Sequence, residues 1–87
     1  MSRGPGAAQR FILGELQDRD RPAPVTTLAF QWANRDNPVP GTPGRREFTA
    51  AEYESVRRAC RKLQASGRIK VAMFHYRGGE AAWGYRI

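Results

Sequence analysis

The sequence predicts a small α+β domain in which three helices are followed by a C-terminal β-hairpin. Three observations lead to this fold class. Apolar residues recur at helical spacing in three separate segments. A capping box and a glycine bound the third of these segments. A stretch rich in β-branched and aromatic residues then follows, and Gly78-Gly79 turns it back on itself. With 87 residues, the chain is long enough for one domain with a modest core.

The first helix is expected from about Ala7 to Arg19. Within it, Ala8, Ile12 and Leu16 repeat at four-residue spacing, which places them on one face of a helix. The segment Arg21-Pro22-Ala23-Pro24 ends this helix, because proline lacks the backbone amide and restricts the residue before it.

The second helix follows the two prolines. Its apolar residues fall at the i, i+3, i+4, i+7, i+8 positions of one helical face: Val25, Leu28, Ala29, Trp32 and Ala33. Thr26 or Thr27 is expected as its N-cap, since a hydroxyl there can accept a hydrogen bond from a first-turn amide.

The third helix carries the strongest local signals in the chain. Thr49 and Glu52 form a capping box, and Phe48 and Tyr53 occupy the positions of a hydrophobic staple. Gly67 follows the last periodic residue, where a left-handed C-terminal cap favours glycine. The apolar face consists of Tyr53, Val56, Ala59, Cys60 and Leu63. The opposite face carries charge, on Glu54, Arg57, Arg58, Arg61 and Lys62.

The hairpin is expected from residues 68–76 and 82–87, with Gly78-Gly79 as a tight turn between them. A two-residue turn predicts particular cross-strand partners. These are Phe74 with Trp83 and Ala72 with Tyr85.

Two segments are expected to lack regular structure. Residues 1–6 contain Gly4-Pro5-Gly6 and form a flexible N-terminal arm, so the folded domain spans residues 7–87. Residues 34–47 contain three prolines and two glycines and form a long loop inside the domain.

The net charge of +7 is concentrated in the second half of the chain. Residues 45–87 hold ten basic and four acidic residues, whereas residues 1–44 hold five and four. Such an excess points to a polyanionic partner, most often a nucleic acid, although a solvated basic face is the plain alternative. Thirteen of the fifteen basic residues are arginine, whose planar fork suits phosphate and guanine.

Other classes of protein find little support in the sequence. The lone Cys60 lies on an apolar face, and the lone His75 has no cysteine or second histidine nearby, so we expect no metal site and no cofactor. No nucleophile, base and orienting group occur together, so we do not expect an enzyme. No apolar run reaches about 18 residues and the N-terminus lacks a secretory signal, so we expect a cytoplasmic protein without membrane contact.

The junction of the third helix and the hairpin carries a resemblance to a known family. Residues 55–69, Ser-Val-Arg-Arg-Ala-Cys-Arg-Lys-Leu-Gln-Ala-Ser-Gly-Arg-Ile, resemble the "helix–Leu–x–x–x–Gly–x–Ile–strand" junction of bacterial winged helix-turn-helix regulators. The resemblance implies a winged helix over residues 7–87, with the third helix in the major groove and the hairpin as the wing. The joint at residues 34–47 is longer than the usual turn of about three to four residues.

The resemblance and the charge together predict double-stranded DNA binding, by a small transcriptional regulator or an accessory factor. Arginine can contact guanine or phosphate, and the helix start offers hydroxyls and amides to a phosphate. The candidate DNA-binding residues are Arg45, Arg46, Thr49, Ser55, Arg57, Arg58, Arg61, Lys62 and Arg77.

Several alternatives stay open. Glu54 precedes Arg57 and Arg58 at the spacing of ordinary surface ion pairs, which would make these arginines structural. Trp83 and Tyr85 can stack on bases, but core positions are the commoner role for such residues. A protein-interaction module and an RNA-binding protein are the rival functions, and a homodimer stays open.

Overall fold

The computed structural model describes residues 6–36, 47–76 and 78–87. It contains three helices and an antiparallel strand pair: α1 (Ala7–Gln17), α2 (Val25–Ala33), α3 (Ala50–Ala65), β1 (Lys70–His75) and β2 (Ala81–Arg86). This order confirms the predicted α+β layout of three helices and a C-terminal hairpin. Residues 1–5 of the predicted arm and 37–46 of the predicted loop lie outside the described residues.

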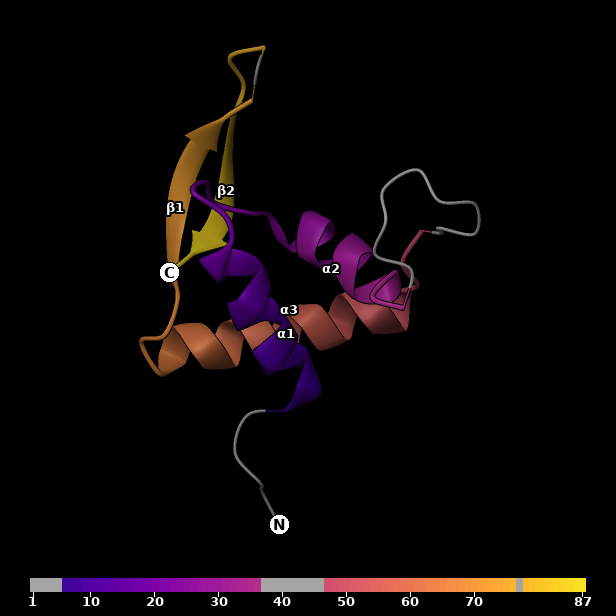
Figure 1. Cartoon of the computed structure of the whole chain (residues 1–87). Coiled ribbons are helices and arrows are strands. Elements are labelled where there is room, and N and C mark those ends of the chain that lie inside the picture. The colour runs from indigo at the N-terminus through magenta and orange to yellow at the C-terminus, as the bar shows by residue number, and fades with distance from the viewer. Residues whose placement is uncertain (1–5, 37–46, 77) are drawn as a thin grey trace.

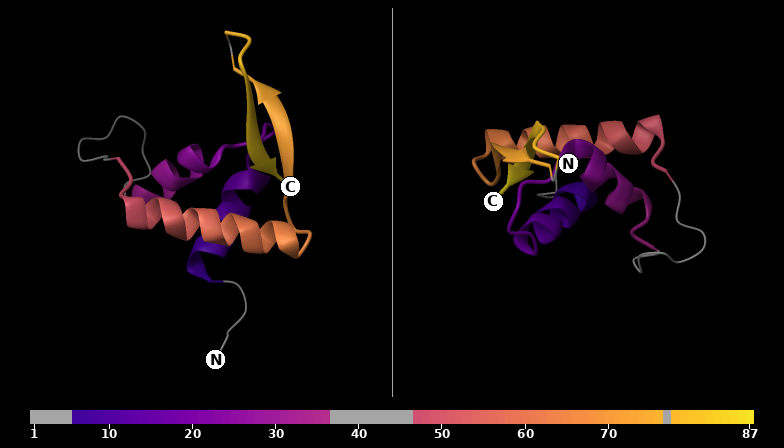
Figure 2. Two further views of the ribbon diagram at one scale, coloured as in Figure 1. Left: turned by 180° about the vertical axis from the view of Figure 1, so that it is seen from behind. Right: turned by 90° about the horizontal axis from the view of Figure 1, so that it is seen from above.

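Helix α3 spans the width of the molecule, and α1 and α2 pack on the same side of it (Figures 1 and 2). The hairpin follows the C-terminal end of α3; its base lies beside α1 and the segment before α2, and its turn end extends away from the helices (Figure 1). The helices meet in a core to which β1 is connected through the buried Ile69. The core consists of Ile12, Leu16, Ala23, Leu28, Ala29, Val56, Ala59, Cys60, Leu63 and Ile69.

Both predicted ends of α3 are confirmed. The Thr49 hydroxyl oxygen accepts from the Glu52 amide at 3.2 Å, and the Thr49 amide donates to the Glu52 carboxylate at 2.8 Å. The Phe48 and Tyr53 rings stack with centroids 5.7 Å apart, as a staple requires. At the other end Gly67 has φ +79°, the left-handed conformation that favours glycine.

The hydrogen bonds beyond α3 form a Schellman motif. The Arg68 amide donates to the Leu63 carbonyl at 2.9 Å, and the Gly67 amide donates to the Gln64 carbonyl at 3.0 Å. The chain therefore leaves α3 at a defined angle, which buries Ile69 and starts β1 at Lys70.

The prediction of a threonine N-cap for α2 is wrong. Pro24 is the N-cap, with ψ 161°, and its carbonyl accepts from the Leu28 amide at 3.1 Å. The preceding residue explains this early start. Ala23 is held in an antiparallel bridge to Tyr85, with bonds of 2.9 and 2.8 Å, so the chain leaves the sheet and enters the helix at once. Helix α1 ends at Gln17, two residues before the expected end at Arg19.

The predicted register of the hairpin is also wrong, by one residue. Met73 pairs with Trp83 and Val71 pairs with Tyr85. The reason is the length of the turn. The Tyr76 amide donates to the Glu80 carbonyl at 2.8 Å and the only positive φ in the turn that the structure describes is at Gly79 (+93°), which indicates a three-residue loop.

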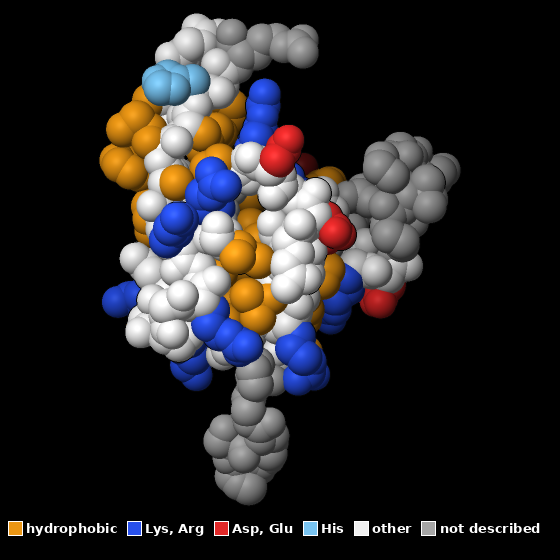
Figure 3. Space-filling model, turned by 60° about the vertical axis from the view of Figure 1, so that its left-hand side comes forward, with side chains coloured by type: hydrophobic (Ala, Val, Ile, Leu, Met, Phe, Trp, Pro, Cys, Tyr) orange, Lys and Arg blue, Asp and Glu red, His pale blue; other side chains and the backbone are white. Residues whose placement is uncertain are grey.

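The two aromatic residues of β2 differ in their exposure to solvent. Tyr85 packs against the core, whereas Trp83 is 62% exposed, so the expectation of a core position holds only for Tyr85. Met73, opposite Trp83, is 50% exposed. Figure 3 shows hydrophobic side chains gathered on the hairpin, with Lys and Arg side chains below them.

Candidate nucleic-acid interface

The outer face of α3 carries most of the predicted DNA-binding residues that the structure describes. Its inner face is buried by Val56, Cys60 and Leu63, so helical geometry directs the intervening polar residues outward. They form two lines at three- and four-residue spacing. One line consists of Ser55, Arg58 and Lys62, and the other consists of Glu54, Arg57 and Arg61.

The side chains on the outer face of α3 differ in their exposure to solvent. Ser55, Arg58, Arg61 and Lys62 are exposed, and 77% of the Arg58 side chain is open to solvent. Arg57 is half-buried, with 37% of its side chain exposed. The exposed members can therefore reorient toward a ligand, whereas Arg57 is more restricted.

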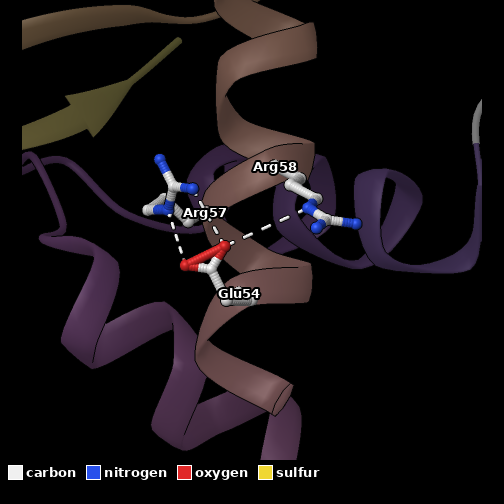
Figure 4. A network of polar contacts seen from close by, with 3 residues as sticks. All are labelled: Glu54, Arg57 and Arg58. Carbon is white, nitrogen blue, oxygen red and sulfur yellow. Dashed lines mark hydrogen bonds and ion pairs between the residues drawn. The ribbon is translucent and has the colours of Figure 1, made fainter. Parts of the chain in front are cut away.

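Glu54 is the cause of that restriction (Figure 4). Arg57 donates two hydrogen bonds to the Glu54 carboxylate, at 3.0 Å from Nε and at 2.9 Å from its terminal nitrogen. This two-pronged arrangement is the geometry in which guanidinium and carboxylate match best. Arg58 lies at 4.0 Å from the same carboxylate, on its other side, and makes only an ion pair.

The pair with Arg57 also changes the pKa of Glu54. The hydrogen bond from Arg57 is the main cause that lowers the pKa of Glu54 below its ordinary value of 4.5. Nearby Arg58 and Arg61 act in the same direction through their charge. Because the folded pKa is lowered, Glu54 is ionised at neutral pH, and the pair is lost only as the pH falls through that lowered value.

The start of α3 is partly occupied by its own cap. Thr49 and Glu52 satisfy each other's amides, so these two donors are no longer available to a phosphate. The Glu52 carboxylate also adds negative charge at the helix N-terminus, which opposes an anion there. Thr49 keeps a hydroxyl hydrogen that can donate, but we expect less from this helix start than from the arginines.

Three predicted residues, Arg45, Arg46 and Arg77, lie outside the described residues. The exposed apolar face of the hairpin was missed from the sequence. The pairing of Met73 with Trp83 would have followed from a turn one residue longer than the expected two, between Tyr76 and Glu80.

The buried cysteine lies apart from this surface. Burial raises the pKa of the Cys60 thiol to about 12, so it stays protonated at neutral pH. No group of three or more His, Cys, Asp or Glu residues that could hold a metal occurs in the described part of the chain. Among the described helices, none has the length and apolar character needed to cross a membrane.

No protein-family model, no curated protein and no solved structure matches this chain. The resemblance of residues 55–69 to winged-helix regulators therefore stays a prediction from the sequence.

Proposed function

We propose that this protein binds double-stranded DNA through the outer face of α3, as a small transcriptional regulator or accessory factor. The observation that supports the proposal is the cationic character of that face. Four basic residues lie along α3, and the Glu54 carboxylate on the same face is already engaged by Arg57. The remaining positive charge of Arg58, Arg61 and Lys62 is exposed to solvent and available to phosphates.

The residues have different roles in this proposal. Arg58 and Arg61 contact phosphates or guanine edges, because their side chains are exposed and their guanidinium groups can bind two acceptors at once. Lys62 and Ser55 add contacts on one side of the helix. Arg57 contributes charge but is held by Glu54, so its approach to DNA requires the pair to open.

The small size of the side chains at the start of α3 supports a close approach to the duplex. Ala50 and Ala51 are both exposed and form the first turn. The hairpin is the wing of this proposal, and Arg77, which lies between the two strands in the sequence, is a further candidate contact. A role on DNA also implies a cytoplasmic location, which the buried, free Cys60 accommodates.

Binding to a random duplex of about 30 base pairs, measured across a salt series, tests the proposal. Arg58→Ala/Arg61→Ala is compared with wild type and with Arg19→Ala/Arg21→Ala, which removes two arginines that lie outside α3. If both arginines of α3 contact phosphate, the log–log salt slope becomes shallower by about 1.8 in the first variant. The control variant should retain the wild-type slope.

Two results would overturn the proposal. One is a wild-type protein that fails to bind the duplex even at low salt. The other is a loss of affinity that is equal in the two double variants, because binding would then depend on net charge and not on α3. The same titration with RNA of equal length decides between DNA and RNA, since tighter RNA binding at equal salt favours the RNA alternative.

A further inference from the structure

Strand β1 has a free hydrogen-bonding edge. Tyr85 exchanges two backbone bonds with Ala23, at 2.9 and 2.8 Å, so its amide and carbonyl point away from β1. Val71, opposite Tyr85, therefore points its own amide and carbonyl away from β2. The alternation of an antiparallel ladder gives Met73 and His75 the same direction. No backbone bond to these outward groups occurs among the described residues.

Beyond its first residue, Lys70, the free edge lacks the usual protection of an edge strand. Natural edge strands are shielded by charged side chains, proline or bulges. Apart from Lys70 at its first position, β1 has no Lys, Arg, Asp or Glu, and residues 71–76, Val-Ala-Met-Phe-His-Tyr, contain no proline. In Figure 1 β1 lies at the outer side of the hairpin, and no described element covers its edge.

The side chains at this edge are apolar and exposed. Val71 is 41% exposed, Met73 is 50% exposed and Trp83, which pairs with Met73, is 62% exposed. Paired residues of an antiparallel ladder share a face of the sheet. Val71, Met73 and Trp83 therefore form one apolar surface that continues to Tyr85. Beside it is a hollow of about 190 Å³, lined by Val25, Val71, Trp83, Gly84 and Tyr85.

We propose that β1 pairs with β1 of a second copy of this chain, antiparallel and centred on Met73. In this register the outward groups of each strand meet: Met73 faces Met73 of the other copy, and Val71 faces His75. Each such pair can exchange two backbone bonds. The whole of residues 70–76 is then paired.

The charge pattern of β1 fits a second copy. Lys70 is the only Lys, Arg, Asp or Glu of the strand, and in this register it faces Tyr76 of the other copy. No like charges are therefore directly opposed. A foreign acidic strand would meet Lys70 and the adjacent Arg86 at one end of β1, but no lysine or arginine along residues 71–76. On the apolar face, the central pair of methionines is flanked on each side by Trp83, which gives a continuous apolar strip across four strands.

Sedimentation equilibrium of the full chain, from about 5 µM to about 500 µM, tests this proposal independently of DNA binding. Wild type should associate to a dimer. Met73→Lys and Met73→Glu each place like charges directly opposite one another, so each should weaken dimerisation at least about tenfold. An equal mixture of the two should recover a heterodimer, because Lys and Glu then face each other at the centre of the pair.

Ala81→Lys is the matched control, because it adds the same charge to an exposed position on the same face of the hairpin but on β2. It should dimerise like wild type. Far-UV circular dichroism confirms that each variant is folded. A wild type that stays monomeric at the highest concentration overturns the proposal, and leaves the edge to a different partner. Met73 variants that dimerise like wild type, or a mixture that fails to recover the dimer, also overturn it.

Discussion

Replacement of Gly84 by alanine tests the packing of the hairpin against the helical part of the molecule. Gly84 is buried in β2 at the point where Ala23 crosses beside the strand. A Cβ atom added there would lie 2.8 Å from the carbonyl carbon, 2.9 Å from the nitrogen and 3.0 Å from the oxygen of Ala23. All three are backbone atoms, so no side-chain rotation can relieve the contact and the Ala23 segment must move.

The expected loss can be worked out from the contacts that would change. Movement of Ala23 weakens both of its hydrogen bonds to Tyr85, and each contributes about 1 kcal/mol net. Against this, alanine restricts the unfolded chain more than glycine, which recovers about 0.4–1 kcal/mol. We therefore expect Gly84→Ala to lower the free energy of unfolding by about 1–2 kcal/mol, a shift in Tm of roughly 4–16 °C for a domain of this size.

Gly14→Ala is the matched control, because a Cβ at Gly14 meets nothing within 4 Å and the residue lies inside α1. Alanine there should stabilise the protein by about 0.5–1 kcal/mol. Urea unfolding followed by far-UV circular dichroism measures both variants. The two changes in free energy should have opposite signs. If Gly84→Ala is as stable as wild type, or if both variants shift in the same direction, the close approach of Ala23 to β2 is refuted.

Three further predictions follow from α3. Thr49→Ala removes the cap and should cost about 1 kcal/mol of unfolding free energy, whereas Thr26→Ala, at an exposed and uncapped position, should cost less. The Cys60 thiol should react with a disulfide reagent at pH 8 at least about 100-fold more slowly in the folded protein than in urea, and equal rates would contradict its burial. Burial raises the pKa of the Cys60 thiol in the folded protein to about 12 from an ordinary 9.0. The thiol therefore contributes fully to the free energy of unfolding below pH 9, and this contribution declines as the pH rises toward 12. On the proposed function, Glu54→Gln releases Arg57, so the salt slope of duplex binding should steepen by about 0.9; an unchanged slope would show that Arg57 contacts no phosphate.

The features that the sequence predicted well are local ones. The ends of α3 depend on side chains only a few residues apart, such as Thr49 with Glu52, so their partners can be read from the local sequence. The Gly67 cap is of the same kind, since one residue supplies the left-handed conformation. The outward position of the α3 arginines follows from helical periodicity alone.

The features that the sequence missed depend on contacts between distant segments or on the length of a turn. The start of α2 at Val25 results from the pairing of Ala23 with Tyr85, which no local pattern encodes. Gly78-Gly79 is compatible with two-residue and three-residue turns, and a slip of one residue changes every cross-strand pair. The exposure of Trp83 was missed for a different reason, because a core position was expected from its residue type alone.

The candidate site likewise contains features that the local sequence predicts and features that it does not. Sequence spacing alone placed Glu54 within reach of both Arg57 and Arg58. Spacing does not predict which arginine binds the Glu54 carboxylate more closely. In the structure Arg57 makes two hydrogen bonds to it, whereas Arg58 lies 4.0 Å away. The two arginines differ in burial, since Arg57 is half-buried and Arg58 is open to solvent, and this difference arises from packing that sequence spacing does not encode.

The two proposed surfaces should respond to salt in opposite directions. DNA binding through α3 releases counterions from the duplex, so it weakens as salt rises. Pairing of two copies through β1 brings together chains that each carry a net charge of +7, while the contact itself is backbone and apolar. Salt screens that repulsion over about 10 Å at 0.1 M, so dimerisation should strengthen between low and moderate salt. Sedimentation and duplex binding measured in the same buffers check this. If self-association falls with salt in parallel with DNA binding, then it depends on charge attraction, and the β1 edge is not the surface that joins the two copies.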